Sequence, residues 1–361
     1  MNGLFYCDWF QEYTAALALS VAESHKVTLI VRESSSEFRG RREDEEQLHR
    51  DLMQAGIDLR VLPGKYSSVR SMFNIYKIRS DKRKNGYDYF HIQSTDDPRF
   101  LWLALRMPTV CTVHEPGARQ DLHNEFPLLN RGEVVRRLYR YLARRIVVHT
   151  QSGLAGLSAR EARKAVVIPH GVHASVPTES VASKTILFFG RVSAYKGLGT
   201  LLAAMEHVWK VEPQARLQIL ASRPTPGEAE CRYDVSDGRI SATWDGYSKS
   251  DLEHALTNAC AVCLPYTSAS GSGVGAQAYG SGKPIVASDL EGLRALVAHE
   301  ELLVQPGDAD DLARALILVL SRDYGVQEID PIRTWPNVAL AHIATYQSVV
   351  NDDERELQSK S

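Results

Sequence analysis

The chain has 361 residues, of which 44% are hydrophobic and 24% charged, and its formal net charge is −2. This length exceeds that of one ordinary domain, so we expect two domains of about 170 residues each. The composition is typical of a soluble globular protein, and no apolar run reaches the roughly 20 residues of a membrane span. The N-terminus lacks a basic-then-apolar export signal, so the sequence predicts a cytoplasmic protein.

The charge distribution and the cysteine content narrow the possible classes of protein further. Residues 1–172 contain 26 Lys and Arg against 20 Asp and Glu, whereas residues 173–361 contain 16 against 24. This asymmetry indicates that the first half faces something anionic; the alternative is a chance distribution. Five cysteines argue against a disulfide scaffold, and Cys260 and Cys263, inside one apolar run, are interpreted as core residues. No H-E-x-x-H or comparable cluster predicts a metal site.

The first half opens with a strand–helix–strand pattern. Residues 4–7 form an apolar strand, residues 11–24 a helical segment and residues 26–31 a second strand. This alternation is typical of a doubly wound α/β domain. The turn after the first strand contains no glycine, so a dinucleotide fingerprint is absent, which argues against a nicotinamide enzyme.

Two later strands, at residues 88–92 and 109–113, bring histidines to where a ligand binds in such a sheet. In an open α/β sheet, residues near the carboxyl ends of strands line the ligand crevice. His91 and His114 are therefore candidates, and a Glu-Pro-Gly turn directly follows His114. The alternative for each histidine is a structural role.

Two basic segments, at residues 65–84 and 131–145, have the pattern of amphipathic helices. Each combines arginines or lysines with an apolar side. A helix of this kind can lie on an anionic surface, so we hypothesise peripheral contact with the inner face of the membrane through both segments. The alternative is a basic side that is only solvated.

The second half repeats the alternation after residues 173–184, which lose apolar periodicity and are interpreted as an interdomain linker. Its central stretch is 264–293, where an apolar strand, a loop of small residues and a short helix starting at Ser272-Gly273-Val274 follow one another. Free amides and the helix dipole at this helix N-terminus favour an anion, here a phosphate or diphosphate. The alternative is an ordinary glycine-rich turn.

Four segments carry a family pattern, in order along the chain. They are T-V-H at 112–114, VVIPHGV at 166–172, ILFFGRVSAYKG at 186–197, and the helix and strand at 277–293. Together they resemble the retaining family 4 glycosyltransferases of GT-B fold, over nearly the whole chain. The resemblance implies two Rossmann-like, doubly wound α/β domains facing across a cleft, with a nucleotide sugar held mainly by the second.

The expected organisation follows from these patterns together. The first domain occupies residues 1–172, the linker 173–184 and the second domain 185–333. The resemblance implies that a last helix at 334–351 crosses back to the first domain, and a polar, frayed tail is expected at 352–361.

The resemblance also implies roles for individual residues. Arg191 and Lys196 would stabilise the leaving nucleoside diphosphate, where charge develops as the glycosidic bond breaks, and His114 would orient the donor sugar. The donor-binding residues would be Gly190, Ser272, Gly273, Val274 and Gln277. Apart from the resemblance, the candidate acceptor-side residues are His91 and, in the loop that departs from the family pattern, Trp9, Phe10 and Glu12; the alternative for Trp9 and Phe10 is a core role. A UDP-, GDP- or other NDP-sugar is expected to bind without a metal or other cofactor, because the cations and amides of the second domain would neutralise the diphosphate.

Two departures from the family pattern keep alternatives open. Ala269 and Gln277 stand where the family commonly has two glutamates, and residues 8–12 replace its glycine-rich first loop. The expected function is a metal-independent retaining hexosyltransferase with a glycan, lipid-linked or other small acceptor. The alternatives are a catalytically silent sugar-nucleotide-binding subunit and a sugar-nucleotide epimerase of the same fold. No nucleic-acid partner is expected.

Overall fold

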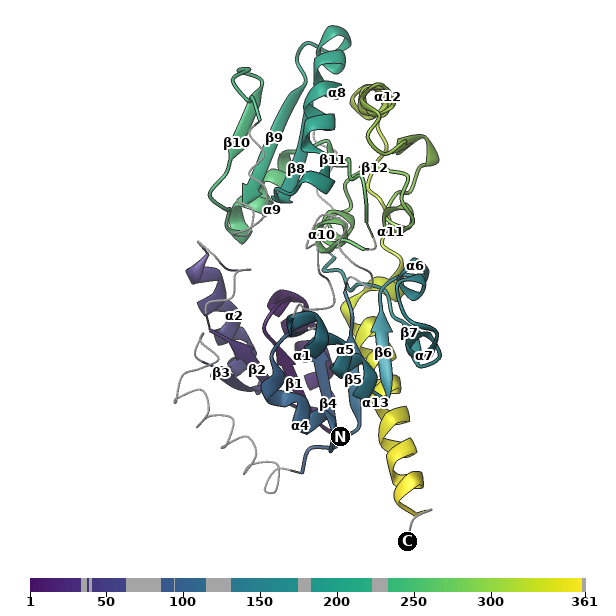
Figure 1. Cartoon of the computed structure of the whole chain (residues 1–361). Helices are drawn as coiled ribbons and strands as arrows, with labels where there is room; N and C mark the ends of the chain where they lie inside the picture. The colour runs from purple at the N-terminus through teal and green to yellow at the C-terminus, as the bar shows by residue number, and fades with distance from the viewer. Residues whose placement is uncertain are drawn as a thin grey trace. The chain divides into compact units, whose positions relative to one another are not determined.

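The computed structural model describes residues 1–33, 38, 41–62, 86–93, 95–114, 131–174, 183–222, 233–269 and 271–358 (Figure 1). The chain divides into two compact units. Unit 1 comprises Met1–Gly171 and Trp335–Ser361, and unit 2 comprises Val172–Thr334. The basic segment at 65–84 lies outside the described residues, as does most of the predicted linker, 175–182.

Within the described residues, unit 1 is built on a parallel sheet of seven strands in the order β3-β2-β1-β4-β5-β6-β7. These strands are β1 Asn2–Cys7, β2 Lys26–Arg32, β3 Asp58–Leu62, β4 Tyr89–Gln93, β5 Thr109–Thr112, β6 Arg145–Val148 and β7 Ala165–Val167. The chain adds β2 and β3 on one side of β1 and then returns to place β4 on the other side. The carboxyl ends of β1 and β4 are therefore the switch point of this sheet, where the connections diverge.

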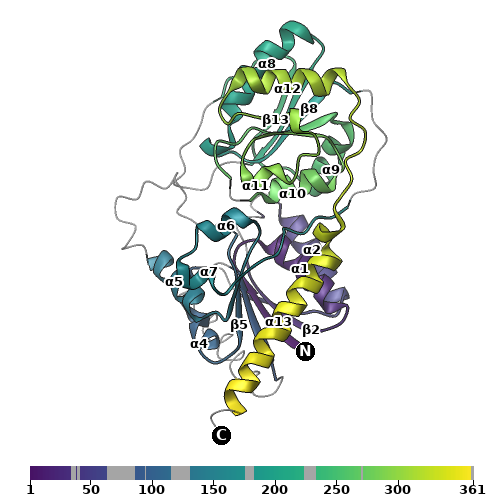
Figure 2. The same cartoon turned by 90° about the vertical axis from the view of Figure 1, so that its right-hand side faces the viewer.

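Helices cover both faces of the unit 1 sheet. They are α1 Gln11–Ala22, α2 Arg42–Gln54, α4 Leu101–Ala104, α5 Arg131–Leu142, α6 Gln151–Ala155, α7 Ala159–Ala162 and α13 Trp335–Gln358, with the 3-10 turn η2 Pro98–Phe100. Successive strand residues point to opposite faces, so β1 contributes side chains to two cores, one on each face of the sheet. Phe5 and Cys7 pack with α1 and α13, whereas Leu4 and Tyr6 pack with α4 and α5. Figure 2 shows α13 running along its face of the sheet beside α1.

Unit 2 repeats this architecture with six parallel strands among its described residues, in the order β10-β9-β8-β11-β12-β13. These strands are β8 Thr185–Arg191, β9 Arg216–Ser222, β10 Ile240–Thr243, β11 Ala261–Leu264, β12 Ile285–Ser288 and β13 Leu303–Val304. The switch point lies between β8 and β11. The fold class predicted from the sequence, two doubly wound α/β domains, is confirmed.

The helices of unit 2 pack on both faces of its sheet. They are α8 Leu198–Val211, α9 Lys249–Asn258, α10 Gly273–Gly280, α11 Glu291–Arg294 and α12 Ala309–Ser321, with the 3-10 turns η4 Ala194–Lys196, η5 Glu300–Leu302 and η6 Pro331–Arg333. Residues of α8 and α12 share one core with Cys263, and residues of α9 and α10 share the other. The thiol of Cys260 donates to the carbonyl oxygen of Thr185. Both cysteines are thus structural, as interpreted from the apolar run.

The last helix extends further than the sequence indicated. We expected a polar tail from residue 352, but α13 continues to Gln358. Two ion pairs fasten this part of the helix beside β6: Arg144 Nη2 lies 2.5 Å from Asp353 Oδ1, and Arg145 Nη2 lies 3.0 Å from Asp352 Oδ2. Partners that are 207 or more residues away in sequence give no local signal in the tail itself.

Gly197 is a position in unit 2 where a side chain would clash with the backbone. It joins η4 to α8 with φ +68°, and an added Cβ would lie 1.8 Å from the carbonyl oxygen of Pro265. Gly307 has a similar φ of +81° with nothing within 4 Å of its Cβ position. Gly197 therefore meets a backbone clash as well as the strain of a left-handed conformation, whereas Gly307 meets only the strain.

We expect Gly197→Ala to lower the free energy of unfolding by about 3 kcal/mol or more, and the control Gly307→Ala by about 1 kcal/mol. Urea unfolding of both variants beside the wild-type chain measures the difference. Equal losses in the two variants would show that the close approach of Pro265 is not a constraint.

Candidate active site

At the unit 2 switch point, a lysine side chain, the N-terminus of α10 and a glycine of β8 lie close together. Gly190, near the end of β8, has φ +114°; a Cβ on it would lie 2.8 Å from Val274 Cγ2 and 3.4 Å from Lys196 Nζ. Because Gly190 has no side chain, Lys196 of η4 and Val274 in the first turn of α10 can both lie close to the end of β8. Arg191 is the next residue, half-buried at the strand end.

Lys196 is held by a tyrosine that the sequence analysis missed. Its ammonium, on a side chain only 5% exposed, donates a hydrogen bond of 3.0 Å to the hydroxyl oxygen of Tyr266 and lies 4.8 Å from the centre of that ring. The same hydroxyl lies 3.3 Å from Ser272 Oγ, at the start of α10. Burial raises the pKa of Tyr266, so the phenol stays neutral. Its position two residues past β11, at the switch point, was the only signal in the sequence.

The N-terminus of α10 is capped by one side chain. Ser272 Oγ accepts a 2.9 Å hydrogen bond from the amide of Gly275. The amides of Gly273 and Val274, in the first turn, have no acceptor within an α-helix. Gln277 is exposed one turn further on, whereas Ala269 packs partly against the core. The combination of a cation, a neutral phenol and helix amides makes the unit 2 switch point a candidate anion site.

The unit 1 switch point has a buried carboxyl group at its centre. Asp8 directly follows β1 and is 2% exposed, and Thr95 Oγ1 donates a 2.6 Å hydrogen bond to its Oδ2. Burial, together with the charges of Asp96 and Asp97, raises the pKa of Asp8 to about 6 in spite of the Thr95 hydrogen bond. In the sequence, Asp8 stood out only as one of residues 8–12, which replace the family's glycine-rich loop.

Phe10 joins that loop to His114. It is the N-cap of α1 and has φ +61°, a left-handed conformation that is uncommon for an aromatic residue. In this conformation its ring stacks on the His114 ring, with centres 3.8 Å apart and planes 18° apart. Of the other predicted acceptor-side residues in this loop, Trp9 is 38% exposed and Glu12 forms an ion pair with Arg41.

His114 is enclosed, and both ring nitrogens have partners. Nε2 lies 2.7 Å from Gln93 Oε1, and Nδ1 lies 3.0 Å from His149 Nε2. Burial, and then the neighbouring histidines, lowers the pKa of His114 well below its ordinary value, so the ring is neutral. Gln93 and His149 are further residues of this site that the sequence analysis did not single out.

The structure places His91, a predicted acceptor-side residue, inside unit 1, as the structural alternative expects. It lies in the middle of β4 and is 1% exposed, with Nε2 2.8 Å from Thr112 Oγ1 and Nδ1 2.8 Å from the hydroxyl of Tyr346 on α13. Burial lowers its pKa to about 3. The strand continues two residues past His91, to Gln93, so the side chain faces the α13 layer and not the carboxyl edge.

Two further properties of the described residues bear on function. No group of three or more His, Cys, Asp and Glu side chains among them is arranged to hold a metal ion. None of the described helices combines the length and the apolar character needed to cross a bilayer.

Two doubly wound α/β units are the architecture of the GT-B fold. Two family models match consecutive parts of the chain: Glycosyltransferase Family 4 at residues 11–176 and Glycosyl transferases group 1 at residues 183–322. The chain belongs to this family, glycosyltransferase family 4 of the group 1 glycosyl transferases, and is a glycosyltransferase.

Known proteins are similar over most of their length. An MMP α-(1→4)-mannosyltransferase of Mycolicibacterium hassiacum is 27% identical over 300 residues, covering 74% of this chain and 72% of the relative. A phosphatidyl-myo-inositol mannosyltransferase of Mycobacterium leprae is 27% identical over 301 residues, covering 74% and 75%. The crystal structure of Anabaena HepE in complex with UDP-glucose has a TM-score of 0.65 at 16% identity, covering 99% of this chain and 100% of that one. The last shows the same fold.

The raised pKa of Asp8 makes stability depend on pH. Its value in the folded chain is about 6 against an ordinary value of 3.8, so the folded state keeps a proton that the unfolded chain releases. This contribution is complete below about pH 4 and is lost as the pH rises to about 6.

Asp8→Asn keeps an acceptor for Thr95 and does not titrate. We expect it to be about 2 kcal/mol more stable relative to wild type at pH 7.5 than at pH 4. Urea unfolding at both pH values measures this, and a difference independent of pH would contradict it.

Proposed function

We propose that this glycosyltransferase moves a hexose from a nucleoside diphosphate to a glycan, glycolipid or small-molecule acceptor, with retention of configuration and without a metal ion. The observation that carries the proposal is the connection of Lys196, through Tyr266, to Ser272 at the start of α10. It puts a buried positive charge beside a helix N-terminus, which is the environment that a departing diphosphate requires. Retention rests on family membership alone.

The proposed chemistry assigns a separate task to each group of unit 2. As the bond from the sugar to the diphosphate breaks, negative charge grows on the leaving phosphate. Lys196 and Arg191 balance this charge, the arginine through two parallel hydrogen bonds. The amides of Gly273 and Val274 donate to the phosphate oxygens, and Gln277 offers the nucleoside a neutral hydrogen-bonding group. With these donors in place, the reaction needs no metal to neutralise the leaving group.

In the proposal, unit 1 supplies the sugar-facing and acceptor-facing residues. His114 orients the donor sugar, and Trp9 and Phe10 offer aromatic surface next to it. Glu12 is less suited to an acceptor than the sequence indicated because it is paired with Arg41. The two mannosyltransferase relatives make mannose the first donor sugar to test and an inositol-containing or mannose-containing glycolipid the first acceptor.

Arg191→Ala and Lys196→Ala should each lower kcat/KM by about 10²-fold, equivalent to about 2.7 kcal/mol of transition-state stabilisation. Tyr266→Phe, which keeps the lysine but removes its hydrogen-bond acceptor, should have a smaller effect of about 10-fold. The assay uses a panel of UDP- and GDP-hexoses that includes mannose. Lys249→Ala, at an exposed lysine of α9, is the matched control and should be fully active.

The same assay separates the alternatives. Full activity of both alanine variants would refute the assigned roles. Nucleotide binding by calorimetry with no turnover on any acceptor would indicate a silent binding subunit. Conversion of the sugar nucleotide with no acceptor present would indicate an epimerase.

We also propose that the cytoplasmic enzyme contacts an anionic membrane surface through α5. Val134, Leu138 and Tyr141, spaced by four and three residues, are 47%, 42% and 54% exposed and form one apolar stripe. The guanidinium of Arg160, on α7, lies 4.1 Å from the centre of the Tyr141 ring. An exposed apolar stripe with cations beside it is suited to the boundary between lipid headgroups and acyl chains.

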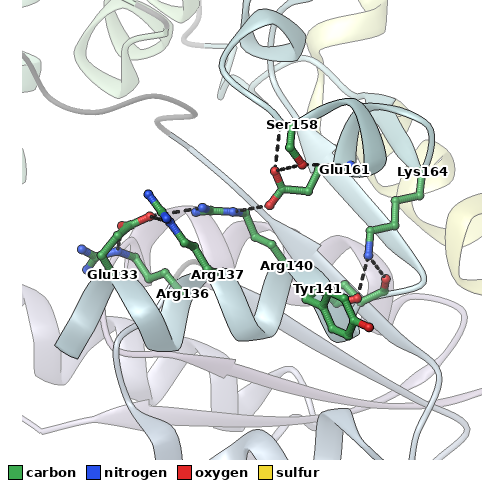
Figure 3. Close-up of polar contacts among 9 residues, drawn as sticks. Glu133, Arg136, Arg137, Arg140, Tyr141, Ser158, Glu161 and Lys164 are labelled. Atoms are coloured by element: carbon green, nitrogen blue, oxygen red, sulfur yellow. Dashed lines mark hydrogen bonds and ion pairs between the residues drawn. The ribbon is translucent and has the colours of Figure 1, made fainter. Parts of the chain in front are cut away.

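Internal ion pairs organise the polar side of α5, as Figure 3 shows. Glu133 pairs with Arg136, Arg137 and Arg140, and Arg140 also binds Glu161. Residues 131–142 and 158–164 still contain seven Arg and Lys against two Glu, a net charge of +5. This surplus supports contact with anionic lipid, although part of the charge counted in the sequence is neutralised within the unit. Contact through 65–84 stays a prediction.

Leu138→Asp is expected to reduce the fraction of protein that floats with vesicles containing anionic lipid by several-fold, because it puts a charge in the centre of the stripe. Leu340→Asp, at a comparably exposed leucine of α13, is the matched control and should float as wild type does. Equal flotation of the two variants, or flotation that does not depend on anionic lipid, would contradict the proposal.

A further inference from the structure

A chain of hydrogen bonds crosses the carboxyl edge of the unit 1 sheet. Gln93 is the last residue of β4, His114 follows β5, His149 follows β6 and Ile168 follows β7. These four strands are consecutive neighbours in the sheet. The contacts are Gln93 Oε1 to His114 Nε2 at 2.7 Å, His114 Nδ1 to His149 Nε2 at 3.0 Å, and His149 Nδ1 to the carbonyl oxygen of Ile168 at 3.0 Å.

The backbone carbonyl sets the direction of this chain. A carbonyl oxygen only accepts, so Nδ1 of His149 carries a proton and donates to Ile168. Burial lowers the pKa of His149 to about 3, so the ring is neutral and its Nε2 is an acceptor. His114 must then donate from Nδ1. Since His114 is neutral as well, its Nε2 has no proton and must accept.

This direction decides the orientation of the Gln93 amide. An unprotonated His114 Nε2 opposite the amide oxygen would set two lone pairs against each other at 2.7 Å. The two ends of an amide are nearly the same size, so turning the amide end for end puts its NH₂ group toward His114 without moving the chain. Every donor in the chain then points toward Ile168.

The far end of the Gln93 amide has no partner in the structure's described residues. Gln93 is 1% exposed, and the amide atom turned away from His114 is buried without a hydrogen bond. In the orientation that His114 requires, this atom is the carbonyl oxygen. A buried oxygen without a donor is costly, and a donor from a ligand at this switch point would recover that cost.

We propose that His149 and His114 hold the Gln93 amide with its carbonyl oxygen toward the substrate, so that unit 1 recognises a sugar hydroxyl as a hydrogen-bond donor. Gln93 is then the residue that contacts the sugar, and His114 and His149 are positioning residues. The proposal deepens the role proposed above for His114 and rests on it. It explains how a histidine whose two ring nitrogens are both engaged within unit 1 can orient a sugar.

The packing around the chain keeps its members in place. The ring of Phe10 covers His114 from one side, and Tyr13 approaches both His114 and His149, with ring centres 4.8 and 5.2 Å away. Within such an enclosed cluster, successive hydrogen bonds polarise one another. Removing the His149 acceptor should therefore change the preferred orientation of the Gln93 amide, two side chains away.

The first experiment needs no substrate. Long-range ¹H–¹⁵N correlation spectra of the ¹⁵N-labelled chain show which ring nitrogen of each histidine carries the proton. We expect His114 protonated at Nδ1, and we expect His149→Leu to move that proton to Nε2. His254→Leu, at an exposed histidine of α9, serves as the control and as an aid to assignment. A wild-type His114 protonated at Nε2 overturns the proposal.

The second experiment uses monodeoxy analogues of the donor sugar and of the acceptor. The wild-type enzyme should use one analogue about 10-fold less well in kcat/KM, and this penalty should disappear in Gln93→Leu and shrink in His149→Leu. His149→Gln keeps an acceptor near the place of Nε2 and should restore the penalty. If every analogue is affected equally in wild type and Gln93→Leu, the hydroxyl contact does not exist.

The two experiments also separate this proposal from the proposed function. If no sugar is transferred from any donor in the panel, the proposed function fails, while the position of the His114 proton still decides whether the hydrogen-bond chain runs as described. If His149→Leu does not fold, the wild-type spectrum and the Gln93→Leu kinetics remain decisive.

Discussion

The order of strands in each parallel sheet is the constraint on which both sites depend. In unit 1 the connections diverge between β1 and β4, and in unit 2 between β8 and β11. All strands of a parallel sheet end at the same edge, so the side chains that follow them gather there, and no helix covers the edge where connections leave in opposite directions. Asp8 and Thr95 meet at one switch point, and Lys196 and Tyr266 at the other.

The buried ammonium of Lys196 has to be stabilised at the unit 2 switch point. A buried ammonium needs a hydrogen-bond partner, because an isolated charge in a protein interior is costly. A carboxylate would satisfy Lys196 but would cancel much of the charge that a diphosphate needs. A phenol accepts from the lysine and stays neutral, since burial raises the pKa of Tyr266. Ala269 carries no negative charge at a position where the family commonly has a glutamate, which in the proposed function leaves the positive charge of Lys196 for the leaving group.

The histidines at the unit 1 switch point are neutral, whereas unit 2 has a buried lysine at its switch point. Burial keeps His114 and His149 uncharged, so they act through the direction of their hydrogen bonds. His91 differs from His114 mainly in its position relative to the end of its strand. It has the same chemistry and similar burial, but it lies two residues before the end of β4, and its partners are Thr112 and Tyr346 inside the fold. Position along the strand, not residue type, separates the two roles.

The sequence by itself determined the class of fold and the family. Apolar strands alternating with helices predicted two doubly wound domains, and the G-R and K-G pairs around residue 190 and the glycine-rich loop before α10 indicated the candidate anion site, because these signals are local. Only the tertiary structure decided which side chains touch. Gln93, His114 and His149 are 21 and 35 residues apart in sequence and become neighbours through strand order. The length of α13 was decided in the same way, by Arg144 and Arg145 of the β6 region. Contacts between adjacent strands or between a strand and a distant helix leave no periodicity in the sequence, so these partners could be found only once the sheet was assembled.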